Sequence, residues 1–162
     1  MLAFNLDTVP LKEMRDPQDG SLRYKVGFPV YAHQGAVDCA VVCMEIEPGR
    51  SLGMHKDSEE ELVLVLEGTA RGTVGEETAE LGAGDAVVIP AMVPHDLSNV
   101  GDGVLRALGF FSGSTVVSTF EPAPMPGAQA MIAFHDRHGE RIMGASELPE
   151  RAGSKSRVEM LA

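Results

Sequence analysis

The chain has 162 residues, 44% of them hydrophobic and 23% charged, and a formal net charge of −11 at pH 7. These values are typical of a single globular domain with room for a hydrophobic core. The acidic balance argues against binding to nucleic acid or to anionic membrane surfaces, because both need a basic face. Apolar runs such as Leu62–Leu66 are far too short to span a bilayer. The N-terminus lacks the pattern of a signal peptide, so we expect a cytoplasmic protein.

Residues 1–21 are predicted to form an N-terminal arm, because they are polar and broken by Pro10 and Pro17. The arm has room for one turn of helix or a short strand. The segment SLRYKVGFPVYAH, which begins at Ser21, is predicted to be a strand. We expect this strand at the edge of a sheet, since Pro29 cannot donate a hydrogen bond to a neighbour.

Residues 22–120 are predicted to form an all-β sandwich or barrel. Short apolar segments alternate there with turns rich in Gly, Asp and Asn, such as GAGD and GDG. None of the segments keeps apolar residues at helical spacing over the length of a helix. Many short, evenly spaced strands favour a sandwich or barrel. The expected strands lie in AVDCAVVCMEI, ELVLVLEG, TARGTVG, ETAEL, DAVVIP, HDLSNV and VLRALGFF.

The two cysteines, Cys39 and Cys43, are predicted to be unpaired buried thiols. Four residues of extended chain span roughly 13 Å, which is too far for an undistorted disulfide. Unpaired thiols fit a reducing compartment.

Residues 121–162 are predicted to form a proline-rich C-terminal tail, partly irregular, because EPAPMPGAQ must stop the sheet. The tail could be an appended strand, a short helix or disordered chain. Its segment FHDRHGER, with His135 and His138, is predicted to be a surface loop rather than a second metal site.

The stretch GRSLGMHKDSEEELVLVLEG contains the candidate site. His55, Asp57 and Glu61 are all odd-numbered, as are Val63 and Val65 in the strand that follows. Residues of equal parity point to one face of an extended segment, so three polar side chains are expected on the face that lines the barrel. A fourth, His95, follows a buried-looking strand and can face the others across a closed barrel.

Imidazole and carboxylate groups together suit a divalent transition metal, namely Fe(II), Mn(II), Ni(II), Co(II) or Zn(II). Two histidines and one carboxylate also leave coordination positions open for a substrate or oxygen. The predicted metal ligands are His55, Asp57, Glu61 and His95.

These residues stand in two motifs that resemble those of the cupin superfamily. The first, G-x5-H-x-H-x3-4-E-x6-G, runs from Gly49 to Gly68, with Asp57 in place of the second histidine. The second, G-x5-P-x-G-x2-H-x3-N, runs from Gly84 to Asn99, with Met92 in place of the glycine. Every spacing is kept, and the resemblance covers about residues 22–115.

The resemblance implies a jelly-roll barrel, also called a double-stranded β-helix, with a metal at its mouth bound by three histidines and a glutamate. His55, Glu61 and His95 match that set, whereas Asp57 does not. Asp57 could complete a site of two nitrogens and two oxygens. Alternatively, Asp57 could stand outside a three-ligand site, or metal binding could be lost and the pocket could bind an organic ligand directly.

The sequence therefore predicts a protein that binds a small molecule beside a divalent metal. The metal would serve an oxygenase or isomerase acting on an oxygen-rich substrate, with Glu61 moving a proton. The alternative is a non-catalytic binding or sensing protein with the same pocket. Arg50, Arg71 and Arg106 are candidates for neutralising an anionic ligand. The resemblance also implies a homodimer, to which residues 22–33 are expected to contribute.

Overall fold

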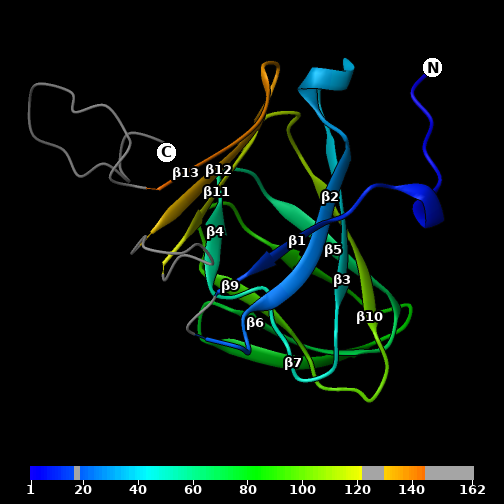
Figure 1. Ribbon diagram of the computed structural model, residues 1–162, viewed down its shortest axis with the longest axis vertical. Coiled ribbons are helices and arrows are strands. Elements are labelled where there is room, and N and C mark those ends of the chain that lie inside the picture. The colour runs from blue at the N-terminus through cyan, green and yellow to red at the C-terminus, as the bar shows by residue number, and fades with distance from the viewer. Residues whose placement is uncertain (17–18, 122–129, 145–162) are drawn as a thin grey trace, which may run out of the picture.

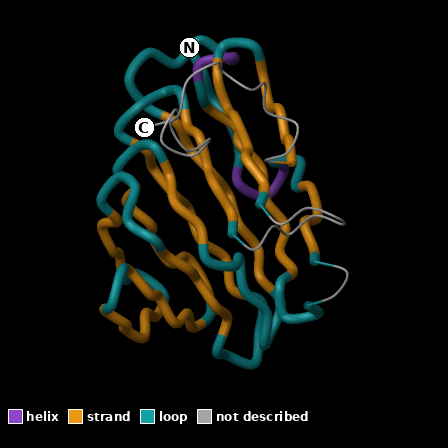
Figure 2. Tube along the Cα trace, turned by 90° about the vertical axis from the view of Figure 1, so that its left-hand side faces the viewer, coloured by secondary structure: helices purple, strands orange, loops and turns teal. Residues whose placement is uncertain are grey.

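The computed structural model describes residues 1–16, 19–121 and 130–144. This part of the chain is built almost entirely from antiparallel strands, which Figure 2 shows in orange, with two single turns of 3₁₀ helix. None of its helices is long and apolar enough to cross a membrane. In chain order the elements are η1 (Leu6–Thr8), β1 (Lys12–Arg15), β2 (Arg23–Val30), η2 (Ala32–Gln34), β3 (Ala40–Ile46), β4 (His55–Asp57), β5 (Glu61–Glu67), β6 (Thr69–Val74), β7 (Glu77–Gly82), β8 (Ala86–Ile89), β9 (His95–Asn99), β10 (Leu105–Phe111), β11 (Val116–Phe120), β12 (Met131–Asp136) and β13 (Gly139–Gly144).

The strands form two sheets. The first has the order β1-β2-β3-β10-β5-β8, and the second has the order β13-β12-β11-β4-β9-β6-β7. Figure 1 shows β11, β12 and β13 on one side of the molecule and β2, β3 and β10 on the other. From β3 to β6 and from β7 to β11, each successive strand lies in the opposite sheet, so the chain crosses repeatedly between the two layers. The predicted all-β fold is confirmed.

The core lies between the sheets, and alternation along the strands decides which side chains enter it. In β5, Glu61, Val63 and Val65 are buried. Leu62, which lies between Glu61 and Val63, is 40% exposed. The same alternation in β4 buries His55 and Asp57 and leaves Lys56 half-buried. The parity that the sequence indicated for His55, Asp57, Glu61 and the two valines is therefore the parity of the folded strands.

The N-terminal arm contains both a helical turn, η1, and a short strand, β1. Because β1 pairs with β2, the prediction that β2 forms a sheet edge is wrong. Pro29 is tolerated in an interior strand for a local reason. Pairing with β1 ends at Val26, and the pairing of β2 with β3 shifts register between Gly27 and Val30.

The segment FHDRHGER is not a surface loop, contrary to the sequence-based expectation. It lies in the hairpin of β12 and β13, and β12 also pairs with β11. Among its histidines, His138 is exposed but His135 is buried, on the same face of β12 as Met131 and Ala133. The tail is thus an appended pair of strands over Met131–Gly144, while the EPAPMPGAQ segment from residue 122 onward lies outside the described residues.

Both cysteines are unpaired, as predicted. Cys43 is buried in β3, but Cys39 precedes the strand and is exposed, so the expectation that both thiols are buried is wrong for Cys39.

Candidate metal centre

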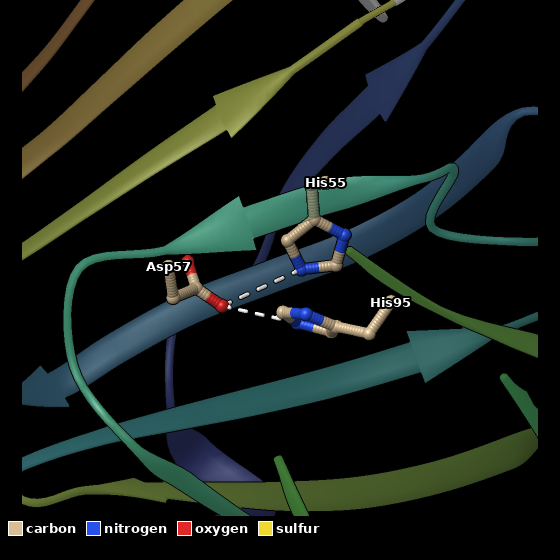
Figure 3. A group of neighbouring side chains, drawn as sticks. All are labelled: His55, Asp57 and His95. Atoms are coloured by element: carbon tan, nitrogen blue, oxygen red, sulfur yellow. Dashed lines mark ion pairs between the residues drawn. The ribbon is translucent and has the colours of Figure 1, made fainter. Parts of the chain in front are cut away.

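The structure brings the four predicted metal ligands together between the two sheets. His55 and Asp57 come from β4, His95 from β9 and Glu61 from the first residue of β5. None of the four is more than 8% exposed. Figure 3 shows the side chains of His55, Asp57 and His95 pointing toward one another.

The Asp57 carboxylate is central to the group. Its Oδ2 atom lies 3.1 Å from Nε2 of His95 and 3.7 Å from Nε2 of His55, the two contacts drawn in Figure 3. One ligand atom from each of these three residues fits into a set in which all atoms lie within 4.8 Å of one another. Glu61 is not part of that set, although its Oε2 lies 3.8 Å from His95 Nε2.

Local pairing explains how residues forty apart in the sequence meet. In the second sheet β4 lies between β9 and β11, and His55 is the direct cross-strand partner of His95. Glu61 approaches from the opposite sheet, where β10 leaves space for it at Gly109. A Cβ atom built at Gly109 would lie only 1.8 Å from Oε1 of Glu61, so no side chain larger than glycine fits beside this carboxylate.

Backbone carbonyls fix the orientation of both imidazoles. His55 Nδ1 lies 2.8 Å from the carbonyl oxygen of Gly53, and His95 Nδ1 lies 2.9 Å from that of Val93. A carbonyl oxygen only accepts, so Nδ1 carries the hydrogen in both rings and donates it. The lone pair of a neutral ring is then on Nε2, directed at Asp57. Histidines that bind metals are commonly held in this way.

Burial and mutual contact shift the ionisation of all four groups. Burial lowers the pKa of His55, and burial together with the charge of Asp57 raises the pKa of Glu61 to about 8. Burial alone would raise the pKa of Asp57, but the two imidazoles and the Ser118 hydroxyl outweigh it and hold this pKa below its usual value. Burial opposes charge on His95 as well, yet contact with Asp57 raises its pKa.

The donor atoms fit a divalent transition metal. Nε2 of His95 is buried and has no hydrogen-bond partner in the described part of the chain. In a neutral ring it would face the Asp57 oxygen at 3.1 Å with one lone pair directed at another, which is unfavourable without a proton or a cation between them. Two imidazole nitrogens and a carboxylate oxygen are ligands that Fe, Co, Ni, Mn and Zn accept.

Ser118 fixes the other oxygen of Asp57. Its hydroxyl donates a hydrogen bond of 2.5 Å to Asp57 Oδ1, and the two residues are backbone neighbours across β4 and β11. The sequence alone could only have placed Ser118 on the same face of the strand as the buried Val116 and Phe120.

The four residues line a cavity of about 70 Å³ between the sheets. A buried water needs roughly 10–15 Å³ of such a cavity. The cavity therefore has room for a molecule of a few non-hydrogen atoms. No Lys or Arg of the described residues lines it, so Arg50, Arg71 and Arg106 do not serve an anionic ligand there. Most of the wall is apolar and includes Val26, Phe28, Val42, Met44, Val63 and Val87.

The remaining motif residues hold the frame of the site. Gly49, Gly68 and Gly84 all have positive φ, a conformation that costs glycine little. Asn99 is buried, and its side-chain amide donates to the carbonyls of Ile46 and Gly103. It therefore ties loops together and does not face a ligand.

Comparison with known proteins supports the resemblance to the cupin superfamily. A family model described as a cupin domain matches residues 42–111. Dimethylsulfoniopropionate lyase DddW of Ruegeria pomeroyi is 30% identical over 113 residues, which are 69% of this chain and 73% of that protein.

Two solved structures show the shared fold. Oxalate decarboxylase of Lactobacillus farciminis, in a formate complex, superposes with a TM-score of 0.59 at 24% identity over 68% of this chain. This chain spans only 33% of that longer protein. The polyketide cyclase RemF of Streptomyces resistomycificus gives a TM-score of 0.58 at 23% identity, over 68% of this chain and 78% of that one.

The chain therefore belongs to the cupin superfamily, and its two sheets form the jelly-roll barrel that the motifs implied. Within that fold, a buried cluster of His55, Asp57 and His95 could hold a metal beside a small cavity.

Proposed function

We propose that this protein is a metal-dependent enzyme acting on a small carboxylate. The observation that carries the proposal is the convergence of His55, Asp57 and His95, with ligand atoms all within 4.8 Å, on the wall of a small cavity. His95 Nε2 is buried and faces two carboxylates among the described residues, Asp57 at 3.1 Å and Glu61 at 3.8 Å. A cation between these atoms would satisfy the nitrogen and both carboxylates.

His55, His95 and Asp57 would hold the metal, and Asp57 would act as a ligand in place of the usual histidine. When bound, the divalent metal acts as a Lewis acid that stabilises negative charge on a substrate oxygen. The apolar wall keeps water out and strengthens the electrostatic interactions inside. The cavity is small, which favours a substrate of a few non-hydrogen atoms over a sugar or nucleotide.

Glu61 is suited to move a proton. Its carboxyl is buried beside His95, and its pKa is raised to about 8 by burial and by Asp57. A carboxylate whose pKa is near the working pH can both accept and return a proton. In an elimination, Glu61 would take the proton from the carbon next to the substrate carboxylate. The electron pair of that C–H bond then forms the double bond as the leaving group departs.

Among reaction classes, we favour a lyase over the oxygenase or isomerase that the sequence alone suggested. The support is the similarity to a lyase that acts on dimethylsulfoniopropionate, which is itself a small carboxylate with a good leaving group. An oxygenase remains the second candidate, because two histidines and a carboxylate leave coordination positions open for oxygen.

The test begins with metal content. Protein purified without chelator should contain about one transition metal ion per chain, and His55→Ala and His95→Ala should each lose most of it. His138→Ala is the matched control, because His138 is an exposed histidine of the same chain and should keep full occupancy.

Turnover is measured next on the metal-loaded protein. With dimethylsulfoniopropionate, a lyase releases dimethyl sulfide without consuming dioxygen, whereas an oxygenase acting on a small carboxylate consumes dioxygen. Loss of turnover in Glu61→Gln with metal retained would support the proton-transfer role. Wild-type protein without metal, or metal content equal in wild type and His95→Ala, would refute the proposal.

A further inference from the structure

Two polar side chains of the cavity are used neither by the metal centre nor by another group of the described protein. Its polar lining residues are Tyr24, His55, Asp57, Glu61, His95, Asp96, Ser118, His135 and Glu140. Once the four candidate metal-binding residues are set aside, five remain.

Three of the five already have partners in the protein. Asp96 accepts hydrogen bonds from the backbone amide of Gly53 and from the hydroxyl of Ser98. Ser118 donates to Asp57, and Glu140 forms an ion pair with Lys12 at 3.5 Å. Tyr24 and His135 are left.

Tyr24 is 5% exposed, and its hydroxyl makes no hydrogen bond within the described part of the chain. It belongs to β2, in the sheet opposite the metal centre, and shares its parity with Val26 and Phe28, which also line the cavity. Burial, and then the charge of Asp57, raises the pKa of Tyr24. The phenol is therefore a neutral hydrogen-bond donor, close enough to Asp57 to sense its charge.

His135 is 6% exposed, and its ring stacks on Phe28 with centroids 3.5 Å apart. Its Nδ1 has no partner among the described residues, and its Nε2 is 4.0 Å from Glu140 Oε1, too far for a hydrogen bond. Burial lowers its pKa to about 4, so the ring is neutral and carries one N–H.

The donor count makes these two residues important for an anionic ligand. Asp57, Glu61 and Glu140 are acceptors when ionised, the imidazole Nδ1–H groups of His55 and His95 are already used, and no described Lys or Arg lines the cavity. A carboxylate can therefore obtain hydrogen bonds from few side chains besides the Tyr24 hydroxyl and the His135 ring. His135 Nδ1 is buried without a partner in the described part of the chain, which is unfavourable, and a ligand that bonds to this ring would remove that cost.

We propose that Tyr24 and His135 form a carboxylate subsite that binds the substrate group not held at the metal. Both residues lie outside the matched cupin segment, residues 42–111, so this subsite would distinguish the chain within its family. With two neutral donors and no cation, it suits one carboxylate or carbonyl group and disfavours phosphates and other multiply charged anions. The proposal rests on the proposed function, in which the substrate is a small carboxylate.

The experiment uses metal-loaded protein with propionate as the probe and tyrosine labelled with ¹³C at the ring carbon that bears the hydroxyl. The chain has two tyrosines, Tyr24 and Tyr31, and Tyr→Phe variants assign the two signals. Tyr31 is the matched control, because it is also buried and packs against His135 but does not line the cavity. Propionate should shift the Tyr24 signal and leave that of Tyr31 in place.

Affinity gives the second measurement. Tyr24→Phe should weaken propionate binding about tenfold or more, since a hydrogen bond to a charged group is lost, and Tyr31→Phe should leave it unchanged. His135→Leu should weaken binding similarly, and His135→Gln should restore part of it. Because the Tyr24 hydroxyl is unpaired in the free protein, Tyr24→Phe should unfold at the same temperature as wild type or higher.

Equal propionate affinity in wild type and Tyr24→Phe, or no detectable propionate binding to the wild type, would overturn the subsite. A fall in melting temperature in Tyr24→Phe larger than in Tyr31→Phe would show a structural role instead. Metal content is measured in the same samples. A protein that holds no metal but still loses propionate affinity on Tyr24→Phe would contradict the proposed function and leave the subsite standing.

Discussion

The Ser118 hydroxyl donates a hydrogen bond of 2.5 Å to Oδ1 of Asp57, while Oδ2 of the same carboxylate faces His95 at 3.1 Å and His55 at 3.7 Å. The two oxygens of Asp57 thus have separate tasks: one is held by the neighbouring strand and the other is presented to the imidazoles. An aspartate is shorter than the histidine usual at this motif position, so its orientation depends on that anchor.

Ser118→Ala is therefore expected to weaken metal binding without unfolding the protein. Removing a partner that orients a metal ligand commonly costs about 10- to 100-fold in affinity. Competition with a chromophoric chelator measures the affinity for Zn(II). Ser112→Ala is the control, because Ser112 is exposed on the loop before β11 and should bind Zn(II) like wild type. An unchanged Zn(II) affinity in Ser118→Ala would show that Asp57 needs no anchor.

Gly109→Ala is expected to displace the Glu61 carboxylate, since the new methyl group would lie 1.8 Å from Oε1 of Glu61 and 2.6 Å from a methyl of Val42. Overpacking of this kind costs about 1–3 kcal/mol of unfolding free energy, measured by urea denaturation. Gly103→Ala should be nearly neutral, because no atom lies within 4 Å of its added Cβ.

The cause of the Gly109→Ala effect can be separated by a second substitution. In the Glu61→Ala background the carboxylate is gone, so Gly109→Ala should cost less than it does in wild type. Additive free energies would mean that Val42, rather than Glu61, meets the new methyl group.

Metal binding is expected to release protons and to strengthen as the pH rises. In the metal-free protein, contact with Asp57 raises the pKa of His95, and burial raises that of Glu61 to about 8, so a metal ion and its positive charge compete with protons at both groups. Affinity should increase by up to about tenfold per pH unit for each proton released, and level off above about pH 8. Calorimetry of Zn(II) binding in two buffers of different ionisation enthalpy counts the protons. A pH-independent affinity would contradict the raised pKa values of His95 and Glu61.

The metal-free protein is expected to lose stability as the pH rises toward 8, on account of Glu61. Its pKa is about 8 in the folded protein against an ordinary 4.5, so between these values the folded state binds a proton that the unfolded state has lost. Stability falls with pH wherever the folded state binds more protons. Thermal unfolding across this range should show the loss in wild type and a smaller one in Glu61→Gln, which cannot ionise. Parallel curves for the two proteins would show that Glu61 titrates normally.

Much of this fold could be predicted from the sequence because the strands of the barrel are short, alternating and separated by glycine-rich turns. The expected segments ELVLVLEG and HDLSNV correspond to β5 and β9, with ends that differ by a residue. Met92 was identified as a departure from the motif glycine, and it does adopt the left-handed conformation that glycine would take there, with φ of 64°. The motif spacing therefore predicts the backbone conformation at this position even though methionine stands in place of glycine.

Other features were missed because pairing partners decide them. Pro29 suggested an edge strand, but the arm adds β1 outside β2. The charged segment FHDRHGER suggested a loop, yet its alternation places His135 among the aromatic rings of the cavity wall. A local pattern reports which residues share a face, and it does not report what lies opposite that face.

The sequence by itself determined the alternation of polar and apolar side chains along each strand. It also determined the motif spacings and hence the superfamily. Periodicity and glycine positions are properties of residues close together in the chain. Only the tertiary structure decided that Asp57 stands between the two imidazoles, that Ser118 holds it, and that Tyr24 and His135 face the cavity without partners. These relationships join residues from different strands and both sheets. They depend on the register and packing of the whole barrel, which no local stretch of sequence encodes.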